Sequence, residues 1–363
     1  MDGHNSSLAC IVVIYTHAKS SMRDAIASRM KRNATLPVLA AALLVTVAMS
    51  IAIGQVWIAP QQIAAMLFNL IVPINHTWSD SDAIIVFLIR FPRTFMALLV
   101  GAGLAVAGVA MQALFKNPLA DPYVLGASSG AGFGAALIIS LGVVGAVYIP
   151  VAAFAGAVIA TFTVYALSMI GPRSSVTLLL LSGIALSTLF SALISYLMFA
   201  AGENLHQLVF WLMGGLWGST WEYVEITLPV ILIGTVVIYA YARDLNLMLS
   251  GEESAQHLGV AVESLKKILL VTVSFIVGVA VAFCGIIGFV GLIVPHVVRT
   301  FTGPDHKALI PASALFGSIL LIWADIVARS AIPGSEMPVG IITALLGAPF
   351  FMYLVRSRRK DIF

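Results

Sequence analysis

Long apolar stretches alternate with short polar breaks along most of this 363-residue chain. A helix that crosses the hydrocarbon core of a membrane needs about 20 mostly apolar residues. Several stretches are short and rich in glycine, so hydropathy alone leaves eight or nine crossings open. We predict an all-α polytopic membrane protein whose residues 34–363 form ten transmembrane helices. The predicted helices span residues 37–58, 94–115, 124–141, 144–170, 176–201, 223–241, 268–284, 286–300, 308–328 and 338–355.

Composition supports a membrane protein and excludes a soluble globular domain. Hydrophobic residues make up 60% of the chain and charged residues 10%, far outside the usual range of soluble domains. The net charge of +3 averages over residues that lie in separate regions, so it does not indicate a nucleic-acid partner. Cys10 and Cys284 suggest no disulfide framework, and the histidines do not lie at metal-ligand spacing. We therefore expect no metal site.

The basic residues are distributed unevenly and predict the orientation of the chain. Both ends are basic, and positively charged segments stay in the cytoplasm, so both termini are expected there and the number of crossings should be even. Ten crossings place sixteen of the 19 Lys and Arg residues on the cytoplasmic side. The three exceptions, expected outside, are Arg90, Arg93 and Arg329.

Residues 1–33 are predicted to form a cytoplasmic N-terminal tail. They contain no short apolar core followed by a small-residue cleavage site, so no cleaved signal peptide is expected. Met30 stands directly before the first apolar stretch and has the context of a natural start. Our hypothesis is that residues 1–29 are a dispensable extension.

Small residues at intervals of four predict close packing between helices. One row is Gly126, Gly130 and Gly134, and another begins at Ala97 and Gly101. Glycine is also common in membrane helices generally, which leaves a less specific explanation open.

The sequence indicates that any uphill transport must be driven by another chain. The predicted helices carry almost no ionisable residues at mid-membrane depth, which disfavours an ion-coupled carrier. No phosphate-binding GxxxxGK[ST] loop is present, so the chain is not expected to be an ATPase. The longest polar break, residues 243–267, reads as a short helix, a break and a second short helix between Gly251 and Gly259. From composition alone, this segment could equally be a solvated connector.

Residues 251–259 follow the pattern Gly-Glu-x-x-Ala-x-x-Leu-Gly, which resembles the coupling element of ABC importer permeases of the iron-chelate and cobalamin (FecCD) family. Further matches occur in the same order along the chain, and together they cover roughly residue 37 to the end. They lie at residues 90–93 (RFPR), 111–122 (MQALFKNPLADP), 210–214 (FWLMG), 288–296 (GFVGLIVPH), 324–329 (ADIVAR), 338–341 (PVGI) and 347–349 (GAP).

The resemblance implies a type II ABC importer permease fold with ten helices per subunit. It implies an obligate homodimer, in which the transport pathway runs between the two copies. Two ATPase subunits, which bind ATP and Mg, would lie below the dimer, and a periplasmic or lipid-anchored substrate-binding protein would dock from outside. No cofactor is expected in this chain, and the implied location is the plasma (inner) membrane of a prokaryote.

The resemblance also assigns roles to the arginines and to the polar break. Residues matching Arg90, Arg93 and Arg329 pair with glutamates of the binding protein. The alternatives are interfacial anchoring for the first two and an i,i+4 pair with Asp325 for the third. The ATPase coupling element maps to Ser250, Gly251, Glu252, Glu253, Ser254, Ala255, Leu258 and Gly259, with both glutamates expected to face basic residues of the ATPase.

Gate and pathway residues are implied in the same way. Asn117 and Leu119 match one cytoplasmic gate, and Val176 and Thr177 match the other, although Asn117-Pro118 is also an ordinary helix stop. The apolar segment Leu205 to Trp217 is too short to cross and is expected to be an outer helix that lines the entrance. The candidate pathway residues are Met198, Phe210, Trp211 and Met213, whose soft or aromatic surfaces could equally be core.

These features together predict the permease subunit of a binding-protein-dependent ABC importer for an iron complex, either a ferric siderophore or haem. The alternative cargo is cobalamin, because the same motifs serve both. A gated channel or an ion-coupled carrier would explain the apolar stretches but not the coupling element. A receptor-like scaffold without transport is a third, weaker hypothesis.

Overall fold

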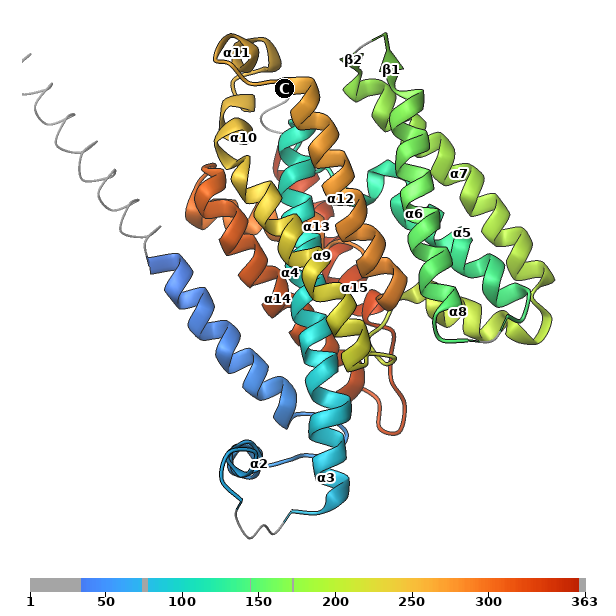
Figure 1. The fold of residues 1–363 in the computed structure, drawn as a ribbon, viewed down its shortest axis with the longest axis vertical. Helices are drawn as coiled ribbons and strands as arrows, with labels where there is room; N and C mark the ends of the chain where they lie inside the picture. The colour runs from blue at the N-terminus through green and yellow to red at the C-terminus, as the bar shows by residue number, and fades with distance from the viewer. Residues whose placement is uncertain (1–33, 74–77, 144, 172, 359–363) are drawn as a thin grey trace, which may run out of the picture.

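The computed structural model describes residues 34–73, 78–143, 145–171 and 173–358. The predicted tail therefore lies outside the described residues. Most of the long helices run roughly along one axis of the molecule (Figure 1). After a first helix, Ala34–Ala52, the elements are α2 (Pro60–Asn69), α3 (Asp80–Ile84), η1 (Ile85–Arg90), α4 (Phe91–Leu114), η2 (Pro122–Leu125), α5 (Ala127–Ser140), α6 (Tyr148–Leu167), β1 (Met169–Ile170), β2 (Arg173–Ser174), α7 (Val176–Ala200), η3 (Gly202–Asn204), α8 (Leu205–Met213), α9 (Trp221–Ala240), α10 (Ala242–Met248), α11 (Glu252–His257), α12 (Val262–Cys284), α13 (Val290–Thr302), α14 (His306–Ser330) and α15 (Val339–Arg358).

Seven helices among the described residues are long and apolar enough to cross a membrane. They are Ala34–Ala52, the continuous helix Asp80–Leu114, α6, α7, α9, α12 and α14. Three shorter apolar helices, α5, α13 and the Val339–Leu354 part of α15, fall on the remaining predicted stretches. The structure thus confirms a mostly helical architecture with helices long and apolar enough to cross a membrane, while the number of crossings stays a prediction.

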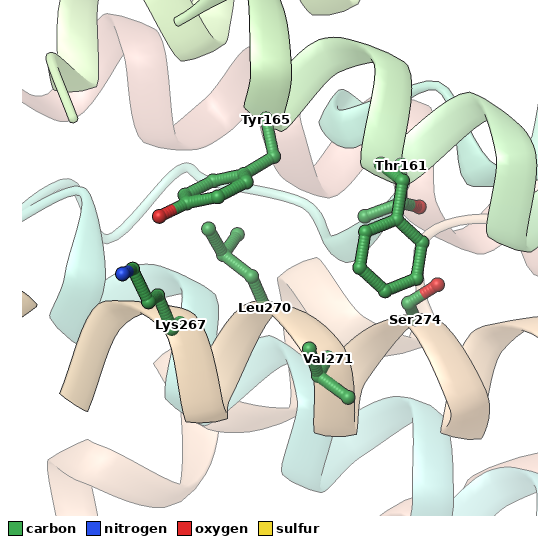
Figure 2. A pocket seen from close by; sticks show the side chains of 7 residues that line it. Thr161, Tyr165, Lys267, Leu270, Val271 and Ser274 are labelled. Atoms are coloured by element: carbon green, nitrogen blue, oxygen red, sulfur yellow. The ribbon is translucent and has the colours of Figure 1, made fainter. Parts of the chain in front are cut away.

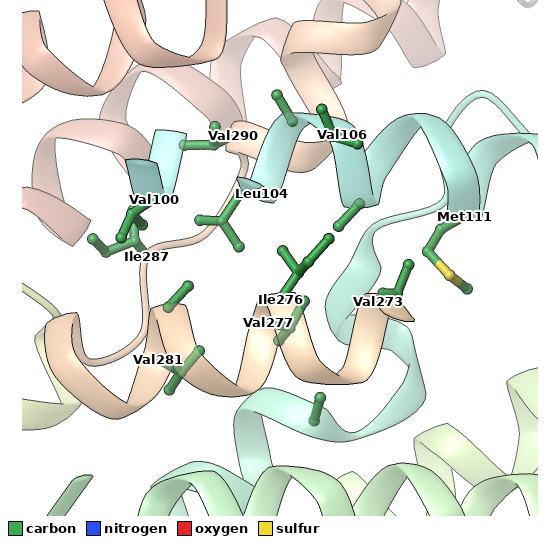
Figure 3. Close-up of a cluster of buried hydrophobic side chains, with 14 of the residues drawn as sticks. Val100, Leu104, Val106, Met111, Val273, Ile276, Val277, Val281, Ile287 and Val290 are labelled. Carbon is green, nitrogen blue, oxygen red and sulfur yellow. The ribbon is translucent and has the colours of Figure 1, made fainter. Parts of the chain in front are cut away.

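Helix α4 is the centre of the packing. It lies among α9, α12, α13 and α14, and its side chains interlock with those of α12 and α13 (Figure 3). Leu104 of α4, Ile276 of α12 and Val290 of α13 are buried in this contact. Because most of α4 is buried against other helices, its sequence is apolar on most sides rather than striped.

Glycines set the closest helix contacts, as the spacing of small residues predicts. A Cβ atom added to Gly101 of α4 would overlap the carbonyl oxygen of Gly317 of α14. Gly130 of α5 lies in the same way against Gly156 of α6. Gly126 does not continue this row, because it caps η2 with φ +76° and serves a turn instead.

Several elements were not predicted. Helix α2 and the extension Asp80–Arg90 before α4 fall in segments expected to be loops, whereas strand β1 replaces the last two residues of the helix predicted over 144–170 and pairs with β2 in the break that follows. The turn η1 is a π-helix that ends just before Pro92, where the missing N–H and the ring of a proline prevent regular α-helical hydrogen bonding. Helix α12 begins at Val262 rather than 268, which moves Lys266 from a polar break into a packed helix.

Candidate functional site

Polar clusters lie at opposite ends of the helix bundle. Helices α10 and α11 and the β1–β2 hairpin are at one end, whereas α2 and α3 are at the other (Figure 1). The three exceptional arginines belong to the second group, since Arg90 ends η1, Arg93 lies in the first turn of α4 and Arg329 lies in the last turn of α14. The bundle therefore separates the predicted coupling element from the predicted docking residues.

The coupling element has the predicted form of two short helices separated by a break. Gly251 lies between α10 and α11 with φ +113°, and Gly259 follows α11 with φ +89°. Such positive φ values are accessible to glycine at little cost. These glycines therefore fix the turns that set α11 at an angle to its neighbours.

Helices α10 and α11 are both fastened to the bundle. Asn246 of α10 contacts the start of α14 through two hydrogen bonds. Its side chain donates to Asp305 Oδ1 at 2.9 Å and accepts from the backbone N–H of His306 at 2.9 Å. Glu252, the first residue of α11, forms an ion pair of 2.8 Å with Lys266 of α12. Each short helix is therefore joined to a long one, α10 to α14 and α11 to α12.

The two glutamates of the coupling element have different surroundings. Glu253 is exposed, whereas Glu252 is half-buried and turned toward Lys266 of the same chain. Ala255 is fully buried and Leu258 is 60% exposed. Ser250, Ser254 and Gly259 are also exposed, and Gly251 is half-buried. The outer face of α11 thus presents Glu253 with the polar side chains of Ser254, Gln256 and His257, and the exposed Leu258 follows directly.

At the opposite end, Asp325 of α14 holds two of the three arginines. Arg93 Nη2 lies 2.8 Å from Asp325 Oδ1, and Arg93 Nε donates to both carboxylate oxygens, at 2.9 and 3.1 Å. Arg329 Nε lies 3.5 Å from Asp325 Oδ2, which confirms the i,i+4 pair predicted as the alternative for that residue. Glu336, in the loop before α15, is a second partner of Arg93 at 2.8 Å.

The three arginines are 4% exposed each, so their charged groups point into the protein. Arg90 donates to the carbonyl oxygens of Ile51 and Ala52, at 2.7 and 3.0 Å, and to that of Val56. It thereby closes the turn after the first helix. The sequence predicts that all three arginines lie on the outer side of the membrane, and their burial is a feature that the charge distribution does not reveal. Their role in docking stays a prediction.

The segments that carry the two predicted gates are in contact. A Cβ atom on Gly183 of α7 would overlap the carbonyl oxygen of Val124 of η2, so η2 packs directly against α7. Asn117 accepts from the backbone N–H of Leu119 at 3.0 Å and is exposed, as is Thr177. Leu119 and Val176 are half-buried. The loop that carries Asn117 and Leu119 thus leads into a turn that packs against α7, the helix that begins with Val176 and Thr177.

The loop after α4 is fixed by polar contacts. Tyr123 donates its hydroxyl hydrogen to the carbonyl oxygen of Ile287 at 2.9 Å, and Asp121 accepts from the backbone N–H of Tyr123 at 2.8 Å. Burial raises the pKa of Asp121 to about 6, from an ordinary value of 3.8. Gln112, in the last turn of α4, donates its amide N–H to the carbonyl oxygen of Leu292 at 3.1 Å and accepts from Arg299 Nη2 at 3.1 Å.

The four pathway candidates are spread over two elements. In α8, Phe210 and Met213 are 36% and 41% exposed, and Trp211 is half-buried. Met198 of α7 is also half-buried. Trp211 lines a pocket of about 190 Å³ beside Trp217 and Tyr223. An adjoining apolar pocket of about 330 Å³ lies between α6, α9 and α12. A third, of about 140 Å³, lies between α6 and α12 (Figure 2).

Sequence reasoning missed the partners that organise both ends. Lys266, Asn246 and Glu336 were not selected, although each fixes a candidate segment. The i,i+3 spacing of Glu263 and Lys266 at the start of a span was the one available signal for Lys266. For Glu336, which meets Arg93 across 243 residues, the sequence offered no such signal.

The comparisons with known proteins agree with this arrangement. The model of the FecCD transport family matches residues 42–357. The chain belongs to the FecCD transport family. It is therefore an ABC importer permease, a type of subunit that carries no ATPase site of its own.

Relatives of this FecCD permease have different named cargoes. It is 48% identical over 286 residues to the cobalamin import system permease protein BtuC of Halobacterium salinarum, covering 79% of this chain and 77% of that one. It is 39% identical over 326 residues to the Fe(3+)-citrate import system permease protein YfmE of Bacillus subtilis, covering 89% and 95%. A metal-chelate type ABC transporter solved in an inward-facing conformation matches with a TM-score of 0.76 and 34% identity, covering 89% of this chain and 98% of that one.

Proposed function

We propose that this permease crosses the membrane ten times, with both termini in the cytoplasm, and imports a bulky metal chelate as a homodimer. Two ATPase subunits bind beneath α10 and α11, and a substrate-binding protein delivers the cargo at the opposite end. The observation that carries this proposal is the placement of the coupling element and the arginine–carboxylate cluster at opposite ends of one bundle.

The size of the pockets supports a pathway between two copies. The pockets of 140, 190 and 330 Å³ are too small for a ferric siderophore, haem or cobalamin. Helix α7 is instead largely uncovered in the single chain. Its exposed Thr188 and Ser195 already donate to carbonyl oxygens of their own helix, each at 2.9 Å. A second copy facing α7 would enclose a surface that can pass cargo without binding it tightly.

An iron complex is the cargo predicted from the sequence, and the 39% identity to an Fe(3+)-citrate permease supports it. Cobalamin is the second candidate, supported by the 48% identity to a cobalamin permease. The pathway has to admit either one, whereas the binding protein selects between them.

Uptake into proteoliposomes tests the function and the cargo together. The permease is reconstituted with its ATPase subunits and binding protein, and labelled ferric siderophore, haem and cyanocobalamin are supplied in turn. We expect uptake of an iron complex that requires ATP and both partners. Uptake of cyanocobalamin alone would select the second candidate, and uptake without ATP or partners would overturn the proposal in favour of a carrier.

Docking in this proposal depends on Arg90, Arg93 and Arg329, although their guanidinium groups are buried. Glu336 is the partner of Arg93 nearest to the solvent, with 36% of its side chain exposed. A carboxylate of the binding protein can reach Arg93 by taking the place of Glu336. Because planar guanidinium groups bind carboxylates in a defined orientation, such an exchange would also orient the delivery protein.

Replacing Glu336 by Gln tests docking without breaking the buried pairs. Loss of the competing carboxylate should tighten binding of the delivery protein by up to about fivefold, the effect of a half-exposed ion pair worth ~1 kcal/mol. Exposed Glu203 of η3 supplies the control E203Q. Equal affinities of E336Q, E203Q and wild type in a binding titration would argue against docking at Arg93.

A further inference from the structure

Lys266 carries one of the most deeply buried charges in the described part of the chain. It lies in the second turn of α12 and is 2% exposed. A buried ammonium group is tolerated when it is paired and its N–H groups are hydrogen-bonded. Lys266 Nζ has three oxygen partners, which are Glu252 Oε2 at 2.8 Å, Glu263 Oε1 at 3.1 Å and the carbonyl oxygen of Ser174 at 3.4 Å.

These partners come from three separate parts of the fold. Glu252 begins α11, Glu263 belongs to the first turn of α12, and Ser174 ends β2. Glu263 also binds the hairpin directly, because its Oε2 accepts hydrogen bonds from both the backbone N–H and the hydroxyl of Ser174, each at 3.0 Å. One cluster of two carboxylates and one ammonium group therefore ties the coupling element to the β1–β2 hairpin.

The hairpin leads straight into α7. Ser175, the next residue after Ser174, caps this helix by accepting from the backbone N–H of Leu178 at 3.4 Å, and its own N–H donates to the carbonyl oxygen of Ser168 at 3.1 Å. The predicted gate residues Val176 and Thr177 are the first two residues of α7. A shift of Ser174 must therefore move the start of the helix that carries this gate.

We propose that Glu252, Lys266, Glu263 and Ser174 form a relay that transmits movement of the coupling element to the gate at the start of α7. The proposal rests on the proposed function, because it assumes an ATPase partner beneath α11. It assigns Lys266 a positioning role and gives Glu252 an internal partner, while Glu253 faces outward. The three oxygen partners of the Lys266 ammonium group satisfy a buried charge, and a satisfied polar network of this kind is rigid, which suits transmission.

The relay predicts that its loss uncouples transport from ATP hydrolysis. The variants are E252Q and K266M, and the matched control is K267M, because Lys267 is exposed and lines the pocket between α6 and α12 (Figure 2). Each variant is reconstituted with the ATPase and binding protein, and cargo uptake and phosphate release are measured on the same vesicles. We expect uptake per ATP to fall by about tenfold in E252Q and K266M, within the range of allosteric couplings, while K267M keeps the wild-type ratio.

A double-mutant cycle separates a relay from simple loss of stability. If Glu252 acts through Lys266, the E252Q/K266M double variant should be no more uncoupled than either single variant. E252Q removes a half-exposed charge and keeps a hydrogen-bond acceptor, so it stays testable if K266M does not fold. Wild-type uptake per ATP in E252Q, or additive losses in the double variant, would overturn the relay. Failure of the proposed function would look different, since wild type itself would then show no ATP-driven uptake.

Discussion

Replacement of Asp325 should weaken the end of the bundle that carries the three arginines. The Asp325 side chain is 1% exposed and contacts the guanidinium groups of both Arg93 and Arg329. The variant D325N keeps the shape of the side chain and removes the negative charge. Two buried cations would then face each other across a neutral amide.

The loss of stability in D325N depends on the partners that Arg93 and Arg329 keep. Removing one member of a buried ion pair costs about 3–5 kcal/mol, because it leaves an uncompensated buried charge. Arg93 retains Glu336 at 2.8 Å, and Arg329 retains the carbonyl and hydroxyl oxygens of Ser50, at 2.6 and 2.8 Å. These contacts place the expected loss near the lower limit, at about 3 kcal/mol. If the unfolding entropy per residue equals that of soluble domains, this loss of free energy lowers the midpoint temperature of unfolding by roughly 4 °C.

Thermal unfolding of the purified permease, followed by tryptophan fluorescence, measures this loss. E336Q is the reference variant, because the half-exposed pair of Glu336 with Arg93 should contribute less than about 1 kcal/mol. The reasoning requires D325N to unfold at a clearly lower temperature than E336Q. Equal midpoints for the two variants would refute it, since they would show that burial of Asp325 does not strengthen its pairing.

Two further predictions concern packing and pH. G108A should destabilise the permease by about 1–3 kcal/mol or more, because its Cβ would overlap the backbone carbonyl of Gly291; G218A, with open space around its Cβ, should retain wild-type yield and melting behaviour. Burial raises the pKa of Asp121 to about 6, so the native state binds this proton more tightly than the unfolded chain and gains stability as pH falls from 7 to 5. The melting temperature of wild type minus that of D121N should therefore increase as the pH is lowered from 7 to 5. A difference that stays constant over this interval would contradict the raised pKa of Asp121.

The sequence predicted the features that depend on local pattern. Apolar length placed the long helices, and the glycines at 251 and 259 predicted the break that sets α11 apart. The burial of Arg90 and Arg93 was not predictable in this way, because charge distribution reports on the side of the membrane and not on where a side chain points. The Lys266 cluster joins residues from α11, α12 and β2, so its existence depends on how those elements meet.

The contrast between α4 and α7 determines where the protein can be altered for experiment. In the most apolar part of the helix containing α4, 83% of the residues are buried, against 11% in α7. Nearly every position of α4 meets backbone or side chains of a neighbour, so few substitutions will be tolerated there. Phe199 at the far end of α7 is 91% exposed in the single chain, so a fluorescent or spin label at this position would report on the face that the second copy covers in the proposed dimer. Probes for movement of this permease therefore belong on α7, with α4 as the fixed frame of reference.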